Sequence, residues 1–185
     1  MEFRLTYSGP LHTYGSPEEK QRIRLHFHPQ LTELWLTHPG LTQLQGRWQK
    51  ESLAKVGAWQ FQPLVTSRWR LHCRLNILFL RPGLPGKLIS KGGDIDNRIK
   101  TLFDALRIPA LGELPKPNDP PWKGVTCCLL ENDSLISGFD VETDQLLGGE
   151  AGGGPPMPDS CVQLVIHVAV KSALSLSGLG LAVWS

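Results

Sequence analysis

Charge and long apolar runs are both scarce in this sequence of 185 residues. Charged residues make up 19% of the chain, below the roughly 25% of typical soluble proteins. No uncharged apolar run reaches the length of about 18 residues that a membrane-spanning helix needs. Glu2 and Arg4 also stand where a secretory signal would have its apolar core. We therefore expect a protein with no membrane partner and no signal peptide.

Cysteine is also scarce, and its spacing excludes the common cysteine-based sites. The chain has four cysteines, with no Cys-x-x-Cys pair and no histidine at zinc-finger spacing. We expect the thiols to act as small apolar residues in a protein of the reducing cytoplasm. Nothing in the sequence indicates a small-molecule cofactor. The cysteines are Cys73, Cys127, Cys128 and Cys161.

The net charge of +2 conceals two halves of opposite charge. Residues 1–92 contain 13 Lys and Arg against 5 Asp and Glu, and residues 93–185 contain 6 against 12, so the halves carry +8 and −6. Such asymmetry indicates a polyanion partner for the basic half, and an ordinary solvated surface is the alternative. From Ser67 onward, alternation predicts a long strand with one basic face. The predicted nucleic-acid contacts on that face are Arg68, Arg70, His72 and Arg74.

Hydrophobic periodicity predicts helices and strands in a single domain of residues 1–185. Ser16-Pro17-Glu18-Glu19 is a capping box that begins a helix, in which Pro29 predicts a kink or a break. An apolar stripe predicts a second helix over Ile95 to Leu106. Together these elements predict an α+β fold with a small mixed or antiparallel sheet flanked by helices. Strands are predicted at 3–7, 67–77, 126–130, 134–147 and 161–171.

The start of the second predicted helix carries the residues most suggestive of chemistry. Asp94 and Asp96 stand two positions apart, and such residues share a side only on extended backbone. If both bind one ion, Asp94 must precede the helix and Asp96 must lie at or beside its N-cap. Carboxylates suit Mg²⁺, which completes its octahedron with water and phosphate oxygens. Asp133, just before a predicted strand, is the expected third ligand, and Glu131 is the alternative.

Two other interpretations of these carboxylates follow from their spacing. A calcium loop is excluded, because its sixth position would be Ile99 instead of glycine and its twelfth would be Ala105 instead of glutamate. A structural interpretation stays open. In it, Asp96 caps the helix and pairs with Lys100, and Asp133 is a turn residue.

The same segment resembles the RusA-type Holliday junction resolvases, also called crossover junction endodeoxyribonucleases. The resemblance covers residues 91–147 and extends to the strands near 71–80 and 162–171. An acidic turn that ends in Asp133 is part of it. The other matching residues are Asp94-x-Asp96-Asn97, Lys100, and Phe103-Asp104-Ala105-Leu106.

This resemblance implies a RusA-like fold and a Mg²⁺-dependent endodeoxyribonuclease that hydrolyses phosphodiester bonds in branched DNA during recombination and repair. It implies that Asp94, Asp96 and Asp133 bind the metal, and that Lys100 is a catalytic lysine that stabilises the reacting phosphate. It also implies a homodimer. A four-way junction has two-fold symmetry, and paired cuts require two sites related by the same symmetry.

The chain departs from the family pattern in two segments, and a third segment is expected to be irregular. Residues 109–124, rich in proline, lengthen the interval between Asp96 and Asp133 and are expected to be an insertion. Residues 16–62 are expected to be an additional helical region. Residues 148–158, rich in glycine and proline, are expected to be a flexible loop.

Some motif residues and the function itself have alternatives at this point. Asn97 and Asp104 match the motif, but each also has a structural alternative. In that alternative, Asn97 only braces the turn and Asp104 only anchors the helix. The strand after Asp133 is acidic where the family tends to be basic. A non-catalytic module for DNA binding or dimerisation is the alternative function. Cleavage is favoured over it because the three aspartates and Lys100 are all present.

Overall fold

The computed structural model describes residues 1–82, 95–115, 124–147, 158 and 160–172. Helices and strands both occur along this chain, which confirms the expected α+β class. Two of the helical elements, η1 and η2, are single 3₁₀ turns. The elements are β1 (Glu2–Pro10), α1 (Pro17–Thr37), α2 (Pro39–Ser52), β2 (Ala54–Val56), β3 (Trp59–Val65), β4 (Leu71–Arg81), α3 (Ile95–Leu106), η1 (Leu111–Glu113), β5 (Val125–Leu130), η2 (Asp133–Leu135), β6 (Ile136–Gln145) and β7 (Cys161–Ser172).

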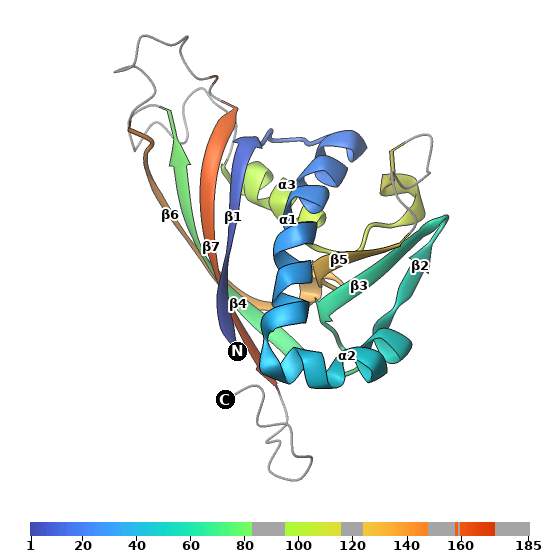
Figure 1. Cartoon of the computed structure of the whole chain (residues 1–185). Coiled ribbons are helices and arrows are strands. Elements are labelled where there is room, and N and C mark those ends of the chain that lie inside the picture. Colours follow the sequence, from blue (N-terminus) through green and yellow to red (C-terminus); the bar gives the residue numbers. More distant parts are fainter. Residues whose placement is uncertain (83–94, 116–123, 148–157, 159, 173–185) are drawn as a thin grey trace.

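The described strands form two mixed sheets, so the expected mixed sheet is divided between two layers. Sheet A has the order β1-β7-β4-β6, in which β7 is antiparallel to both neighbours and β4 is parallel to β6. Sheet B has the order β2-β3-β5, with β2 antiparallel and β5 parallel to β3. Figure 1 shows the two sheets on opposite sides of α1 and α3.

Helix α1 lies in the centre of the molecule. Its side chains Ile23, Phe27 and Leu31 are almost completely buried in a core that includes residues of both sheets. α1 contacts β1, β5, α2 and α3. The region 16–62, expected to be helical, contains α1 and α2 but also β2 and part of β3, and α1 supplies the middle layer of the fold.

The N-cap half of the predicted capping box before α1 is confirmed, while the Glu19 carboxylate contacts His12, and the predicted break near Pro29 is not found. The Ser16 hydroxyl accepts a hydrogen bond of 3.3 Å from the Glu19 backbone N–H, and Pro17 occupies the first helical position. α1 continues through Pro29 to Thr37. Pro29 removes one backbone donor, and burial of α1 against both sheets outweighs that loss.

Several other predictions concern segments that the structure describes only in part. In the insertion 109–124, the described part contains η1, and residues 116–123 lie outside the described residues. The predicted flexible loop at 148–158 also lies outside them, except for residue 158. Among the described residues, no helix has both the length and the apolar character needed to cross a membrane.

The four cysteine thiols are all free, as the sequence predicts. Cys73, Cys127 and Cys128 are buried. Burial raises the pKa of Cys73 to about 12 and also raises the pKa values of Cys127 and Cys128. These three side chains therefore stay protonated at neutral pH and act as apolar core residues.

We expect His28 to make folding stability depend on pH. Its Nδ1 accepts a hydrogen bond of 3.0 Å from the Cys127 backbone N–H, and burial lowers the pKa of His28. As the pH falls, His28 of the unfolded chain therefore takes up a proton before His28 of the folded chain does. The contribution of His28 to the stability of the folded state is complete above the ordinary histidine pKa of about 6.5 and is lost as the pH falls below it. We expect the unfolding free energy, measured with denaturant, to fall between about pH 7 and pH 5. His28→Asn should show a smaller fall, and equal slopes would contradict this role.

Candidate functional site

Helix α3 is held at both ends, and its contacts define its direction. Near the amino end, Asn97 Nδ2 donates to the Tyr14 hydroxyl at 3.3 Å, and the Gly15 backbone N–H donates to Thr101 Oγ1 at 3.2 Å. Just beyond the carboxyl end, the Ile108 backbone N–H donates to the Leu130 carbonyl at 3.0 Å. α3 therefore runs from the β1–α1 loop to the end of β5.

The exposed side of α3 carries two of the predicted catalytic residues. Asp96 and Lys100 are both exposed, and one helical turn separates them. Phe103 continues the same side by another turn, and we name these three residues the α3 stripe. The opposite side is buried through Arg98, Leu102 and Ala105. The helix bounds predicted from the apolar stripe match α3, so the orientation of Asp96 and Lys100 toward solvent follows from the sequence pattern.

Asp133, the predicted third ligand, lies in a 3₁₀ turn next to α3. It follows Leu130 by three residues and begins η2, which contacts α3. Asn132 caps η2 through its side-chain oxygen, so the exposed Asp133 carboxylate does not serve as the cap. Its joint action with Asp96 stays a prediction.

Glu131, the alternative third ligand, is engaged in a structural contact. Its Oε2 accepts hydrogen bonds from the backbone N–H of Ser67 at 2.7 Å and from the Ser67 hydroxyl at 2.8 Å. These bonds fasten the end of β5 to the turn before β4. This contact favours Asp133 over Glu131 as the third carboxylate.

Asp94, the first aspartate of the motif, lies outside the described residues. Within the described ranges, no three His, Cys, Asp or Glu side chains form a group that could hold a metal ion. The part of the predicted site that the structure places together is therefore Asp96 and Lys100. The three-aspartate arrangement stays a prediction from the motif.

Asp104 has a structural role in the described part of the chain. Its carboxylate pairs with Lys20 Nζ at 2.7 Å and with Arg107 Nη2 at 2.9 Å. Arg107 also forms a bidentate pair with Glu113, at 2.7 and 2.9 Å. Partial burial acts to raise the pKa of Asp104, but the hydrogen bonds and charges of Lys20 and Arg107 outweigh it and lower the pKa. Asp104 thus anchors α3 to α1.

Arg24 of α1 completes the carboxyl end of α3. It is 2% exposed, and its guanidinium donates to the Asp104 carbonyl at 2.8 Å and to the Arg107 carbonyl at 3.1 Å. The final carbonyls of a helix lack partners within the helix and carry partial negative charge. Burial lowers the pKa of Arg24 to about 10, so it stays charged at neutral pH and caps the helix.

The four predicted nucleic-acid contacts do not share one strand face. β4 begins at Leu71, so only His72 and Arg74 point outward from the strand. Arg68 and Arg70 lie in the preceding turn, where Arg70 has a left-handed φ of 51°. The alternation of basic and apolar residues continues through this turn, which is why the sequence predicts one long strand.

The turn before β4 forms a basic surface together with α2. Arg68 and Arg47 both pair with Glu51, at 3.1 and 3.0 Å, and the Arg47 guanidinium lies 5.0 Å from the centre of the Trp69 ring. Hydrogen bonds from Arg47 and Arg68 lower the pKa of Glu51. Two arginines thus share one carboxylate, which leaves excess positive charge. We name Arg47, Arg68 and Arg70 the turn surface.

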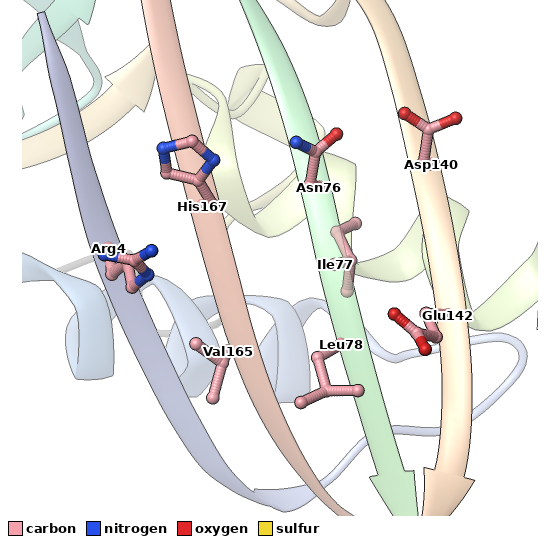
Figure 2. A pocket seen from close by; sticks show the side chains of 8 residues that line it. All are labelled: Arg4, Asn76, Ile77, Leu78, Asp140, Glu142, Val165 and His167. Atoms are coloured by element: carbon pink, nitrogen blue, oxygen red, sulfur yellow. The ribbon is translucent and has the colours of Figure 1, made fainter.

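The outer face of sheet A, by contrast, carries mixed charge. Figure 2 shows a pocket on this face, opposite the helices, with Arg4, His167, Asn76 and Asp140 in one row across the four strands. Arg74 pairs with Asp140 at 2.6 Å. Strand β6 therefore offsets part of the positive charge that β4 contributes.

Two exposed aromatic rings beside the α3 stripe were not among the predicted site residues. Tyr14 is 83% exposed and contacts Asn97, and Phe139 of β6 is 50% exposed. The Phe139 ring meets the Phe103 ring edge to face, with centroids 5.1 Å apart. Phe139 alternates with acidic residues, and Tyr14 stands in a short loop, so neither position has a sequence signal beyond its residue type.

No protein-family model, no curated protein and no solved structure matches this chain. The resemblance to RusA-type resolvases therefore rests on the motif residues, all of which except Asp94 lie in the described part of the chain.

Proposed function

We propose that this protein is a Mg²⁺-dependent endodeoxyribonuclease of RusA-like fold that cuts branched DNA, such as four-way junctions, in the cytoplasm during recombination and repair. The observation that carries the proposal is the exposed pair of Asp96 and Lys100 at the start of α3. Asp94 precedes this pair by two residues in the sequence. The remaining motif residues support the position of the helix, as the contacts of Asn97 and Asp104 indicate.

The residues present fit a hard divalent cation. Mg²⁺ prefers one or two carboxylates and keeps several water molecules, so Asp94 and Asp96 are sufficient protein ligands, with Asp133 as the third. When bound, Mg²⁺ acts as a Lewis acid toward the phosphate oxygens and activates the attacking water. The exposed position of Asp96 leaves room for a bulky DNA strand to approach.

Lys100 has the position and chemistry to stabilise the reacting phosphate. It follows Asp96 by one turn on the α3 stripe, so its ammonium can reach a phosphate beside that carboxylate. Charge on the non-bridging oxygens rises during hydrolysis, and a fixed cation lowers the barrier by opposing it. In the structural alternative, Lys100 only pairs with Asp96.

A direct test is cleavage of a synthetic four-way junction by the purified protein. We expect nicks near the branch point with Mg²⁺ and none with EDTA, and we expect little cleavage of a linear duplex of the same sequence. If the protein acts as the proposed homodimer, the nicks should be paired and symmetric. Tight junction binding without cleavage under any divalent metal would instead favour the non-catalytic module.

DNA binding is expected to use Arg68, Arg70, His72 and Arg74, with Arg47 added to the set by the turn surface. Neutralised phosphates release counterions, so junction affinity should fall steeply as the salt concentration rises. Each phosphate contact that is removed should lower the slope of log affinity against log salt by about one. Arg68→Ala combined with Arg70→Ala removes two such contacts and should lower the slope by about two. Arg4→Ala, on an edge strand of sheet A, should leave the slope unchanged. A flat salt response of the wild type would discredit this surface.

A further inference from the structure

Tyr14 belongs to a loop that is fixed to α3 and not free to move away from it. The Thr101 hydroxyl accepts from the Gly15 backbone N–H and donates to the Thr13 carbonyl at 3.5 Å. A methyl group on Gly15 would lie 2.4 Å from Thr101 Cγ2, so the loop backbone lies directly against the helix. Asn97 adds a third contact, to the Tyr14 hydroxyl.

The high exposure of the Tyr14 ring is therefore built into the structure. Single exposed apolar side chains are common, and exposure alone does not indicate a function. Tyr14 is 83% exposed although its hydroxyl and its neighbours are hydrogen-bonded to α3. These contacts orient a flat aromatic surface toward solvent at the amino end of α3.

Phe139 occupies the corresponding position on the other side of the stripe. Viewed along the α3 axis, Asp96 and Lys100 lie between Asn97 on one side and Phe103 on the other. Asn97 contacts Tyr14, and Phe103 contacts Phe139. Asn97 and Phe103 differ by six residues, or about 9 Å of helical rise. The exposed acidic and basic groups are thus flanked by one aromatic ring on each side.

On this basis we infer that Tyr14 and Phe139 stack on unpaired bases at a DNA branch point and so position the phosphate between them at Asp96 and Lys100. Any base offers a π-face, so aromatic stacking selects single-stranded or unstacked bases without regard to sequence. Bases in a continuous duplex are already stacked on each other. The two rings would therefore favour branched DNA over linear DNA. This inference rests on the proposed function and adds the source of its structural selectivity.

Photo-cross-linking tests the inference without requiring cleavage. A four-way junction with 5-bromouracil in place of thymine at the branch point is bound to the protein in EDTA and irradiated, and the cross-linked residue is identified by mass spectrometry. We expect cross-links at Tyr14 or Phe139. Cross-links confined to other residues, with junction binding intact, would overturn the inference.

Affinity measurements give a second, independent readout. Tyr14→Leu should lower the ratio of junction to duplex affinity by about tenfold, within the range for loss of one stacked base, and Phe139→Leu should also lower it. Tyr14→Phe keeps the ring and should keep most of the ratio. Leu36→Ala, which shortens an exposed side chain near the other end of α1, is the matched control and should change nothing. An unchanged ratio in Tyr14→Leu and Phe139→Leu would overturn the inference.

The outcomes separate this inference from the proposed function. Cross-links at Tyr14 or Phe139 in a protein that does not cut with Mg²⁺ would support stacking and contradict the nuclease. Mg²⁺-dependent cutting with cross-links elsewhere would support the nuclease and contradict stacking. Thermal unfolding of each variant checks that it remains folded, as expected for exposed positions.

Discussion

Asp96→Asn is expected to abolish junction cleavage while junction binding persists. The amide keeps the size of the side chain but removes the charge that would hold Mg²⁺ at the start of α3. We expect the nicking rate to fall by about 100-fold or more, the order of loss that follows removal of a key electrostatic contact. Because the variant loses a negative charge, its affinity for the junction should equal or exceed that of the wild type. Single-turnover nicking and a filter or gel binding assay measure the two effects.

Glu18→Gln provides the matched control for this variant. Glu18 also lies in the first turn of a helix, where carboxylates interact favourably with the helix dipole. Its substitution therefore reproduces the loss of a first-turn charge away from the predicted metal site. We expect Glu18→Gln to cut at the wild-type rate. A normal cutting rate in Asp96→Asn would remove this residue from the site.

Asp104→Ala is expected to have the opposite phenotype, a large loss of stability with cleavage retained. Asp104 is 13% exposed and neutralises Lys20 and Arg107, so its removal leaves two partly buried cations without this carboxylate. Breaking such a pair from one side costs about 2–4 kcal/mol of unfolding free energy. For a chain of this size the corresponding fall in Tm is roughly 6–12 °C. Calorimetry or denaturant titration provides the measurement.

Two comparisons show whether that effect is specific to Asp104. The first comparison is Asp140→Ala, which breaks the ion pair of Asp140 with Arg74. The two side chains are 63% and 53% exposed, so the substitution should lower the unfolding free energy by less than about 1 kcal/mol.

The second comparison is cleavage by Asp104→Ala at a temperature where this variant is folded. Its nicking rate should lie within about threefold of the wild-type rate. Loss of cleavage in a fully folded Asp104→Ala would assign this residue to the chemistry.

The sequence predicts α3 and its exposed residues well because local signals agree there. Ile99 and Leu102 recur on one side, and that periodicity alone orients Asp96 and Lys100 toward solvent. The start of α1 is also predicted correctly, since Ser16 makes a capping contact within its own first turn. In both cases the deciding interactions lie within a few residues along the chain.

Other parts of the fold depend on contacts that local patterns do not report. Arg68, Trp69 and Arg70 alternate like a strand, yet they form a turn in which Trp69 stacks on Trp48 of α2 with ring centroids 4.8 Å apart. β3 contains Pro63 and is buried on both faces over most of its length, so it lacks the period-two pattern.

The same limit applies to the residues around the candidate site. Lys20 and Asp104 pair across 84 positions of sequence, and Tyr14 and Asn97 across 83. Motif spacing identifies Asp104 and Asn97 as notable, but only their distant partners distinguish a structural role from a chemical one. Asp133 illustrates the reverse case: its motif position suggests a ligand, but its place next to α3 depends on β5 and η2, which are distant from α3 in sequence.

The most direct test of the central claim is the Mg²⁺ dependence of junction nicking, measured in single turnover for the wild type and Asp96→Asn side by side. The account predicts a wild-type rate that rises with Mg²⁺ and saturates, no cutting in EDTA, and a rate at least about 100-fold lower in Asp96→Asn at every concentration. Equal rates in the two proteins, or wild-type nicking that is independent of the metal, would contradict it.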